Sequence, residues 1–132
     1  MNINFKNKTI LITGASNGIG LTLFKRFKKL GGRVVGTRKN NSNKNLIYVN
    51  FSDEKSLENF CTKIKKIKKI DVLINNAGSN KINDITSLKD QDIKEIISTN
   101  LTAPMKIIRE VAKKMNMTVN DLMLGITSRA LK

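Results

Sequence analysis

The chain has 132 residues, of which 39% are hydrophobic and 27% are charged, and its formal net charge is +15. This length accommodates one domain around a single core, so residues 1–132 are expected to form one domain. The sequence has no apolar run long enough to span a bilayer and no secretion signal at its start. Its single cysteine, Cys61, has no partner for an internal disulfide. These features predict a cytoplasmic protein without a membrane partner.

The excess of positive charge has two interpretations. Clustered lysines and arginines attract nucleic acids, because binding to phosphates releases condensed counterions. However, the lysines fall on the polar sides of expected helices, and aromatic residues that could stack on bases make up only 5% of the chain. We therefore interpret the charge as a solvated surface and expect no nucleic-acid partner. No metal site is predicted either.

Short apolar runs alternate with amphipathic segments, which predicts strands alternating with helices. Strands are expected at residues 9–13, 33–37, 46–50, 71–75 and 122–128. Because no tight hairpin joins them, the strands are expected to be parallel, with helices on both faces of the sheet. The fold class is therefore α/β, a doubly wound parallel sheet of about five strands that is incomplete at its C-terminal side. The alternative for the last segment is an unrelated tail.

Three helices are expected between these strands. The first ends at a pair of glycines, as helices commonly do. The second can be capped by Ser52 or Asp53. The third is expected to run from a capping box formed by Ser87 and Asp90 as far as Met115.

The turn after the first strand is rich in glycine and has the sequence Thr13-Gly14-Ala15-Ser16-Asn17-Gly18-Ile19-Gly20. Glycine tolerates positive φ and has no Cβ, so the backbone here can press directly against a ligand. The helix that follows begins with unpaired N–H groups and a positive dipole end, both of which suit a phosphate. This combination predicts a site for a dinucleotide pyrophosphate.

Four motifs follow one another along the chain: Gly14-x-x-x-Gly18-x-Gly20, Asn50-Phe51-Ser52-Asp53, Asn75-Asn76-Ala77-Gly78 and Asn100. In this combination they resemble the classical short-chain dehydrogenase/reductase family over almost the whole chain. The N-terminal part is similar to the 3-oxoacyl-acyl-carrier-protein reductase branch. The resemblance implies a Rossmann-type domain of an oxidoreductase, which moves a hydride between a nicotinamide cofactor and a small-molecule carbonyl or alcohol substrate.

The resemblance also assigns cofactor contacts by position. The residues concerned are Gly14, Ser16, Asn17, Gly18, Ile19 and Gly20 around the phosphates, Asn50 and Phe51 beside the adenine, and Asn76, Ala77 and Gly78 on the adenosine side. We expect Asn75 to tie neighbouring strands together rather than to touch the ligand.

The end of the second strand carries Thr37-Arg38-Lys39 and no acid. Sites that prefer NAD usually place an Asp or Glu here, which accepts a hydrogen bond from the ribose 2′-OH. A carboxylate would repel a 2′-phosphate, whereas Arg38 can bind one with paired donors. We therefore predict NADP(H) in preference to NAD(H), with Thr37 and Arg38 in the cofactor site. The competing interpretation is that Arg38 and Lys39 are two more solvated cations.

Pro104 lies inside the expected third helix, where it cannot donate to the carbonyl four residues back and its ring pushes on that carbonyl. That carbonyl belongs to Asn100 and is expected to be free to bind water. The resemblance implies that the matching Asn holds, through its main chain, a water in the proton-relay path. The alternative is an ordinary proline kink, and the sequence favours neither.

The family's general acid/base is a Tyr with a Lys four residues later, whose charge lowers the pKa of the tyrosine toward working pH. The chain has one tyrosine, Tyr48, and the residue four positions later is Ser52. Tyr48 also lies on the third expected strand, so it is not the catalytic tyrosine. The last segment resembles the family's fifth strand, which would make Ser128 the catalytic serine. The Tyr and Lys would be expected beyond Lys132.

Two functions are consistent with these observations. The first is an NADP(H)-dependent oxidoreductase by descent, truncated before its Tyr and Lys and therefore inactive or very weak as an isolated chain. The second is a catalytically silent cofactor-binding module or gene remnant that a second polypeptide completes. A chain that stops at the fifth strand is expected to expose a strand edge and apolar surface. It would then depend on a partner, either as a homo-oligomer or with a complementing chain.

Overall fold

The computed structural model describes residues 3–39, 45–81 and 84–115. Within these ranges four parallel strands form one sheet in the order β3-β2-β1-β4: β1 (Thr9–Ile12), β2 (Arg33–Arg38), β3 (Ile47–Tyr48) and β4 (Val72–Ile74). The α-helices are α1 (Gly18–Lys29), α2 (Glu54–Lys66), α3 (Asp90–Ile97) and α4 (Ala103–Met115). A 3-10 turn, η1 (Ile85–Ser87), precedes α3, and a π-helical turn, η2 (Ser98–Thr102), joins α3 to α4. The predicted α/β class with a parallel sheet is confirmed.

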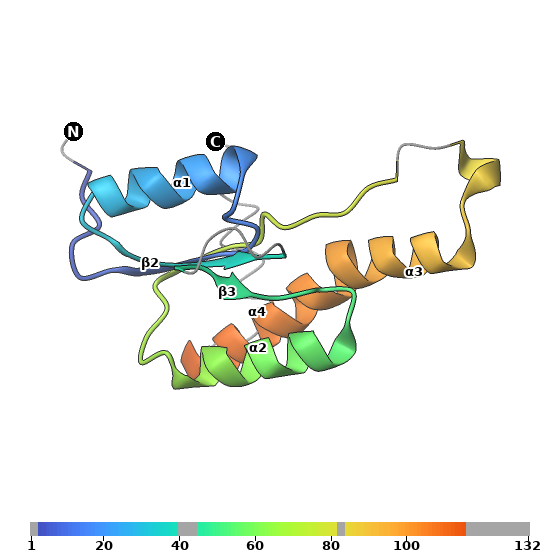
Figure 1. The fold of residues 1–132 in the computed structure, drawn as a ribbon. Helices are drawn as coiled ribbons and strands as arrows, with labels where there is room; N and C mark the ends of the chain where they lie inside the picture. Colours follow the sequence, from blue (N-terminus) through green and yellow to red (C-terminus); the bar gives the residue numbers. More distant parts are fainter. Residues whose placement is uncertain (1–2, 40–44, 82–83, 116–132) are drawn as a thin grey trace, which may run out of the picture.

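Helices cover both faces of the sheet, with α1 on one face and α2 and α4 on the other (Figure 1). The side chains of β1 explain this arrangement, because they point alternately to the two faces. Ile10 and Ile12 are fully buried in the cluster that includes Phe24 of α1. Leu11 is fully buried in the opposite cluster, which includes Phe60 of α2 and Ile107 of α4. The central strand is therefore apolar on both faces, as a doubly covered strand must be.

The sheet has a topological switch point between β1 and β4. β1 pairs with β2 on one side and with β4 on the other. The chain leaves β1 for α1 on one face, whereas the segment after β4 leads to α4 on the other face (Figure 1). The two connections diverge and leave a crevice at the carboxyl ends of these strands, which is where ligands bind in sheets of this kind.

Three of the four described strands are shorter than the sequence predicts, whereas β2 extends one residue further, to Arg38. β3 covers two residues, Ile47–Tyr48, where five were expected, and β4 covers three. The strand expected at 122–128 lies outside the described residues. Of the two caps expected for α2, Asp53 is the N-cap, because its carboxylate accepts a hydrogen bond from Ser56 N at 2.8 Å.

The third helix begins later than predicted. Ser87 lies in η1, where its hydroxyl donates to the backbone oxygen of Asp84 at 2.8 Å. The predicted capping box of Ser87 and Asp90 is therefore wrong, because the Ser87 hydroxyl is already used in the preceding turn. Instead, the N–H of Lys89 donates to the Asp92 carboxylate at 3.3 Å and so closes the start of α3.

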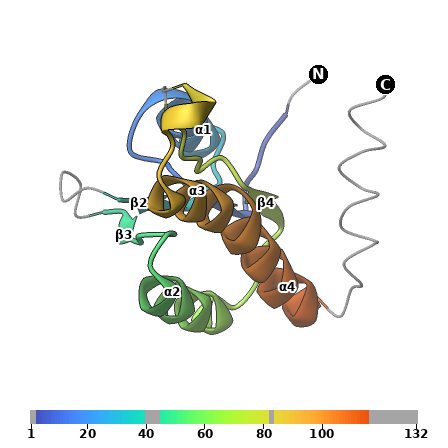
Figure 2. The same ribbon diagram turned by 90° about the vertical axis from the view of Figure 1, so that its right-hand side faces the viewer.

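The third helix is also divided by η2. The N–H of Ala103 donates to the carbonyl of Ser98, five residues back, where an α-helix would use the carbonyl four residues back. This widened turn ends two residues before Pro104 and contains Asn100. Figure 2 shows α3 and α4 as one continuous segment through this turn, with α2 beside α4.

Residues four apart share a face along this segment. The buried row consists of Thr99, Ala103, Ile107 and Val111. The exposed apolar row consists of Ile93, Ile97, Leu101 and Met105.

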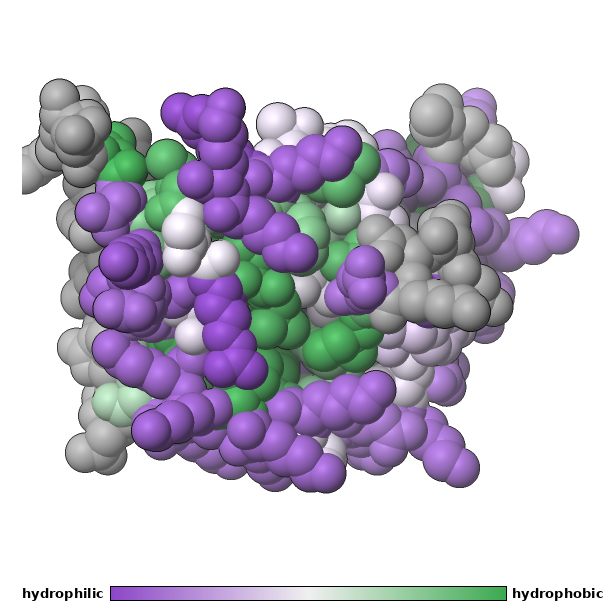
Figure 3. All heavy atoms as spheres, turned by 60° about the vertical axis from the view of Figure 1, so that its left-hand side comes forward, coloured by the Kyte–Doolittle hydropathy of each residue, from purple (hydrophilic) through white to green (hydrophobic). Residues whose placement is uncertain are grey.

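The surface carries many hydrophilic side chains, and Figure 3 shows one face on which they surround a smaller apolar area. Some of the lysines form ion pairs. Lys69 and Lys8 lie 2.8 and 3.6 Å from the Asp71 carboxylate. The hydrogen bond from Lys69, with one from the N–H of Thr9, holds the pKa of Asp71 below its ordinary value.

In the described part of the chain, no helix is long and apolar enough to cross a membrane.

Candidate functional site

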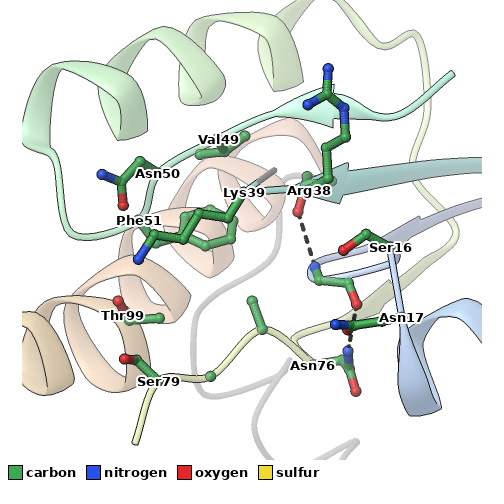
Figure 4. A pocket seen from close by; sticks show the side chains of 14 residues that line it. Ser16, Asn17, Arg38, Lys39, Val49, Asn50, Phe51, Asn76, Ser79 and Thr99 are labelled. Carbon is green, nitrogen blue, oxygen red and sulfur yellow. Dashed lines mark hydrogen bonds between the residues drawn. The ribbon is translucent and has the colours of Figure 1, made fainter. Parts of the chain in front are cut away.

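A cleft of about 260 Å³ opens at the carboxyl ends of the strands (Figure 4). The residues that line it are Gly14, Ser16, Asn17, Thr37, Arg38, Lys39, Val49, Asn50, Phe51, Asn76, Ala77, Gly78, Ser79 and Thr99. This set includes every predicted cofactor residue except Gly18, Ile19 and Gly20. The structure thus brings together residues that the sequence separates by up to 85 positions, from Gly14 to Thr99.

The glycine turn after β1 is held between the end of β2 and the segment that follows β4. Gly14 has a φ of +66°, and its N–H donates to Thr37 Oγ1 at 3.0 Å. The N–H of Ala15 donates to the Thr37 carbonyl at 2.7 Å. On the other side, a Cβ at Gly14 would lie 2.9 Å from Ala77 Cα. Both the conformation and the space therefore require glycine here, and the fully buried Thr37 holds the turn in place.

Residues 18–20, the other predicted phosphate contacts, form the first turn of α1 and do not line the cleft. A Cβ on Gly20 would overlap the Gly14 carbonyl oxygen and lie 2.5 Å from Asn76 Nδ2, so this glycine allows α1 to approach the turn. The Asn17 side chain does not cap α1, and the first turn of α1 carries no acidic residue. The N–H groups and positive dipole end of α1 are therefore suited to an anion.

Asn76 ties the ends of β1 and β4 together. Its side-chain amide donates to the backbone oxygens of Thr13 at 3.1 Å and Gly14 at 3.0 Å. In return, Thr13 Oγ1 accepts hydrogen bonds from the N–H groups of Asn76 and Ala77, both at 3.0 Å. These groups are paired with one another at the floor of the cleft, where Thr13 is 2% exposed.

The sequence predicts this tie from Asn75, and that prediction is wrong. Side chains alternate along an extended segment, so Asn76 follows Ile74 toward the α1 side, where the glycine turn lies. Asn75 is exposed, and its side chain makes no hydrogen bond to the described residues.

Asn100 holds the loop after β4 against η2. Its Oδ1 accepts a hydrogen bond from the N–H of Ser79 at 2.7 Å, and its Nδ2 donates to the Ser79 carbonyl at 2.8 Å. Both ends of the Asn100 side chain are thus engaged. The family resemblance implies a water at the main chain of Asn100. That water site stays a prediction. Ser128, the other predicted catalytic residue, lies outside the described residues.

An ion pair that the sequence does not predict crosses the mouth of the cleft. Lys39 Nζ lies 3.0 Å from Glu95 Oε1 on α3, and Figure 4 shows the Lys39 side chain extending across the cleft past Phe51. Glu95 also pairs with Lys81 at 3.3 Å and accepts a hydrogen bond from Ser79 Oγ at 3.3 Å. Hydrogen bonds from Lys39 and Lys81 hold the pKa of Glu95 below its ordinary value, and Glu95 raises the pKa of Lys81.

Arg38 lies at the outer end of the cleft. Its guanidinium carbon is 5.9 Å from the centre of the Tyr48 ring, a distance at which a cation and an aromatic face attract each other. Figure 4 shows this side chain pointing away from Ser16 and Asn76. The two adjacent cations, Arg38 and Lys39, therefore extend in different directions from the end of β2.

Sequence reasoning missed four of the residues that line the cleft: Lys39, Val49, Ser79 and Thr99. All four directly adjoin predicted site residues, Thr99 being next to Asn100, so extending each motif by one position identifies them. Glu95 lies on α3, where no local pattern marks it as part of a site.

The chain matches the family model described as short chain dehydrogenase over residues 8–130. It is 36% identical to the 3-oxoacyl-acyl-carrier-protein reductase FabG of Rickettsia typhi over 121 residues, which is 86% of this chain and 50% of that protein. A solved structure of 4-hydroxyisoleucine dehydrogenase complexed with NADH is 35% identical, with a TM-score of 0.74 over 82% of this chain and 49% of that one. A metagenomic short-chain oxidoreductase in complex with NADP is 25% identical, with a TM-score of 0.74 over 84% and 57%.

The parallel sheet, its switch point and the glycine turn define a doubly wound α/β domain with a cleft at the carboxyl ends of its strands. Within that class, the chain belongs to the short-chain dehydrogenase family of oxidoreductases, as its motifs predict. It spans about half the length of the curated relatives it matches.

Replacing Thr13 with valine tests the tie between β1 and β4. The substitution leaves the N–H groups of Asn76 and Ala77 without their acceptor, so we expect the free energy of unfolding to fall by about 1–3 kcal/mol. Thr13→Ser keeps the hydroxyl and should recover most of the loss. Urea denaturation followed by circular dichroism measures both variants. A valine variant as stable as the wild type would show that the Thr13 hydroxyl does not hold the two strands together.

Proposed function

We propose that the chain binds NADP(H) in the cleft at the carboxyl ends of the strands. The observation that carries the proposal is the convergence of residues 14–17, 37–39, 49–51 and 76–79 on one cleft at the switch point of the sheet. Dinucleotides bind at this place in doubly wound folds. The solved relatives described above hold NADH or NADP, which supports a dinucleotide here but leaves the choice between the two open.

The pyrophosphate and the adenosine half of the cofactor have suitable surroundings at this cleft. The N-terminus of α1 would bind the pyrophosphate, because its N–H groups and dipole favour an anion. Asn50 and Phe51 would lie beside the adenine, and the backbone of Ala77 and Gly78 would contact the adenosine side. When bound, the cofactor supplies the hydride, and the residues of this chain hold and orient it.

The charge at the end of β2 supports NADP(H) over NAD(H). Arg38 and Lys39 both line the cleft, and no acid is present at the end of this strand to accept from a ribose 2′-OH. An arginine binds a phosphate with paired, charge-assisted hydrogen bonds. To do so, Arg38 would exchange its position near the Tyr48 ring for the 2′-phosphate.

Titration of the chain with NADPH and NADH, followed by cofactor fluorescence, tests this proposal. We expect NADPH to bind more tightly than NADH. Arg38→Ala should lower the affinity for NADPH by about tenfold or more, which corresponds to the loss of one charged hydrogen bond. The affinity for NADH should change by less than about twofold. Arg26→Ala, which removes an exposed arginine at the far end of α1, controls for net charge. Equal NADPH affinities of Arg38→Ala and the wild type would remove the argument for NADP(H).

We further propose that residues 1–132 contribute the cofactor half of an oxidoreductase site, on a carbonyl or alcohol substrate, without a general acid/base of their own. Tyr48 lies on β3 with its ring half exposed, and the fourth residue after it is Ser52. The position from which the family's lysine would assist a catalytic tyrosine is therefore occupied by a serine. The alternative is a catalytically silent cofactor-binding module, and both readings allow a second chain to complete the site.

An activity measurement on the isolated chain tests the missing acid/base. With NADPH and a 3-oxoacyl thioester or a simple ketone, we expect no cofactor oxidation above the buffer rate, even where the titration shows binding. NADPH consumption in proportion to the amount of chain would contradict this expectation. In that event Tyr48→Phe would show whether Tyr48 supplies the proton.

A further inference from the structure

We propose that Glu95 competes with a phosphate-bearing cofactor for the Lys39 ammonium, and so sets how strongly the cleft favours NADPH over NADH. The inference rests on the cofactor site proposed above. Glu95 itself lies on α3, outside the lining of the cleft, and acts through a residue that does line it. It is therefore a positioning residue.

The position of Lys39 is the first support. Lys39 follows Arg38, the last residue of β2, on the wall where a 2′-phosphate is expected. Its side chain leaves that wall and crosses the cleft to Glu95, so that Nζ and Oε1 lie 3.0 Å apart (Figure 4). The ammonium is thereby held near the opposite wall, against α3.

The charge balance of the cluster is the second support. Lys81 lies 3.3 Å from Glu95 and 3.5 Å from Asp92, and Lys39 joins the same group through Glu95. Two ammonium groups thus face two carboxylates, and this part of the mouth offers no net positive charge to an anion. Neutralising Glu95 removes the carboxylate that holds Lys39 and releases its ammonium toward the cleft, whereas neutralising Asp92 leaves that carboxylate in place.

The weakness of the ion pair is the third support. The Lys39 side chain is 58% exposed, and exposed ion pairs are screened by water and contribute little. The contact of Lys39 with Glu95 is a charge-assisted hydrogen bond to a single negative charge. A phosphate monoester carries about 1.5–2 negative charges at neutral pH, so a 2′-phosphate draws Lys39 away from Glu95. NADH has no 2′-phosphate and leaves the pair intact. The Lys39–Glu95 ion pair therefore weakens the binding of NADPH and leaves the binding of NADH unaffected.

Dissociation constants for NADPH and NADH, measured by fluorescence titration of the full chain, test the proposal. We expect Glu95→Gln to raise the affinity for NADPH by about three- to fivefold, which is the size of a lost surface ion pair. The affinity for NADH should change by less than about twofold. Asp92→Asn is the matched control. It removes a carboxylate of the same cluster from the same helix, does not contact Lys39, and keeps an oxygen to accept from Lys89. We expect it to change either affinity by less than about twofold.

Lys39→Met in both backgrounds shows whether the effect passes through Lys39. When position 39 carries methionine, Glu95→Gln should no longer alter NADPH affinity, because the two residues act as one coupled pair. Glu95→Gln could leave NADPH affinity unchanged or lower it, or it could raise NADPH affinity equally with and without Lys39→Met. Either result would overturn the inference but would not contradict the proposed cofactor site. A wild-type chain that binds neither cofactor would overturn both.

Discussion

The paired hydrogen bonds between Thr13 and Asn76 are the contact on which the rest of the site depends. β1 and β4 are paired as strands only as far as Ile12 and Ile74, and beyond that point the chain diverges to opposite faces. Bonds of 3.0–3.1 Å hold the two backbones together where they would otherwise separate. The close approach of Gly14 to Ala77 follows from this tie, since it brings the two loops into contact. A cleft with a fixed floor is the result.

The floor and the rim of the cleft are held by different interactions. At the floor, buried side chains bond to backbone groups, and Thr37 fixes the glycine turn from the β2 side. At the rim, the contacts are an ion pair from the exposed Lys39 and an aromatic contact of Arg38. Buried hydrogen bonds resist rearrangement, whereas exposed ion pairs exchange easily. The structure is thus fixed near the expected pyrophosphate and adjustable near the expected ribose.

Local patterns were sufficient to predict the four described strands, the first two helices and the glycine turn, because periodicity and backbone conformation are local properties. Asp53 was identified as a cap on the same basis. The prediction failed where one local signal had two possible partners: the Ser87 hydroxyl bonds backward to Asp84, and Asn76 rather than its neighbour makes the tie. The pairing of Lys39 with Glu95 joins residues fifty-six positions apart and depends on where α3 lies in space. No pattern in the sequence carries that information.

The extra residue in η2 works as an angular correction between α3 and α4. An unbroken α-helix advances about 100° per residue, so the step from Ile93 to Met105 would leave these side chains about 120° apart around the axis. Widening one turn by a residue removes about 100° of that difference and leaves about 20°. The same correction keeps Thr99, Ala103 and Ile107 buried. Deleting one residue from Ser98–Thr102 would therefore rotate α4 as a whole, turning its buried row away from the sheet instead of merely shortening the connection.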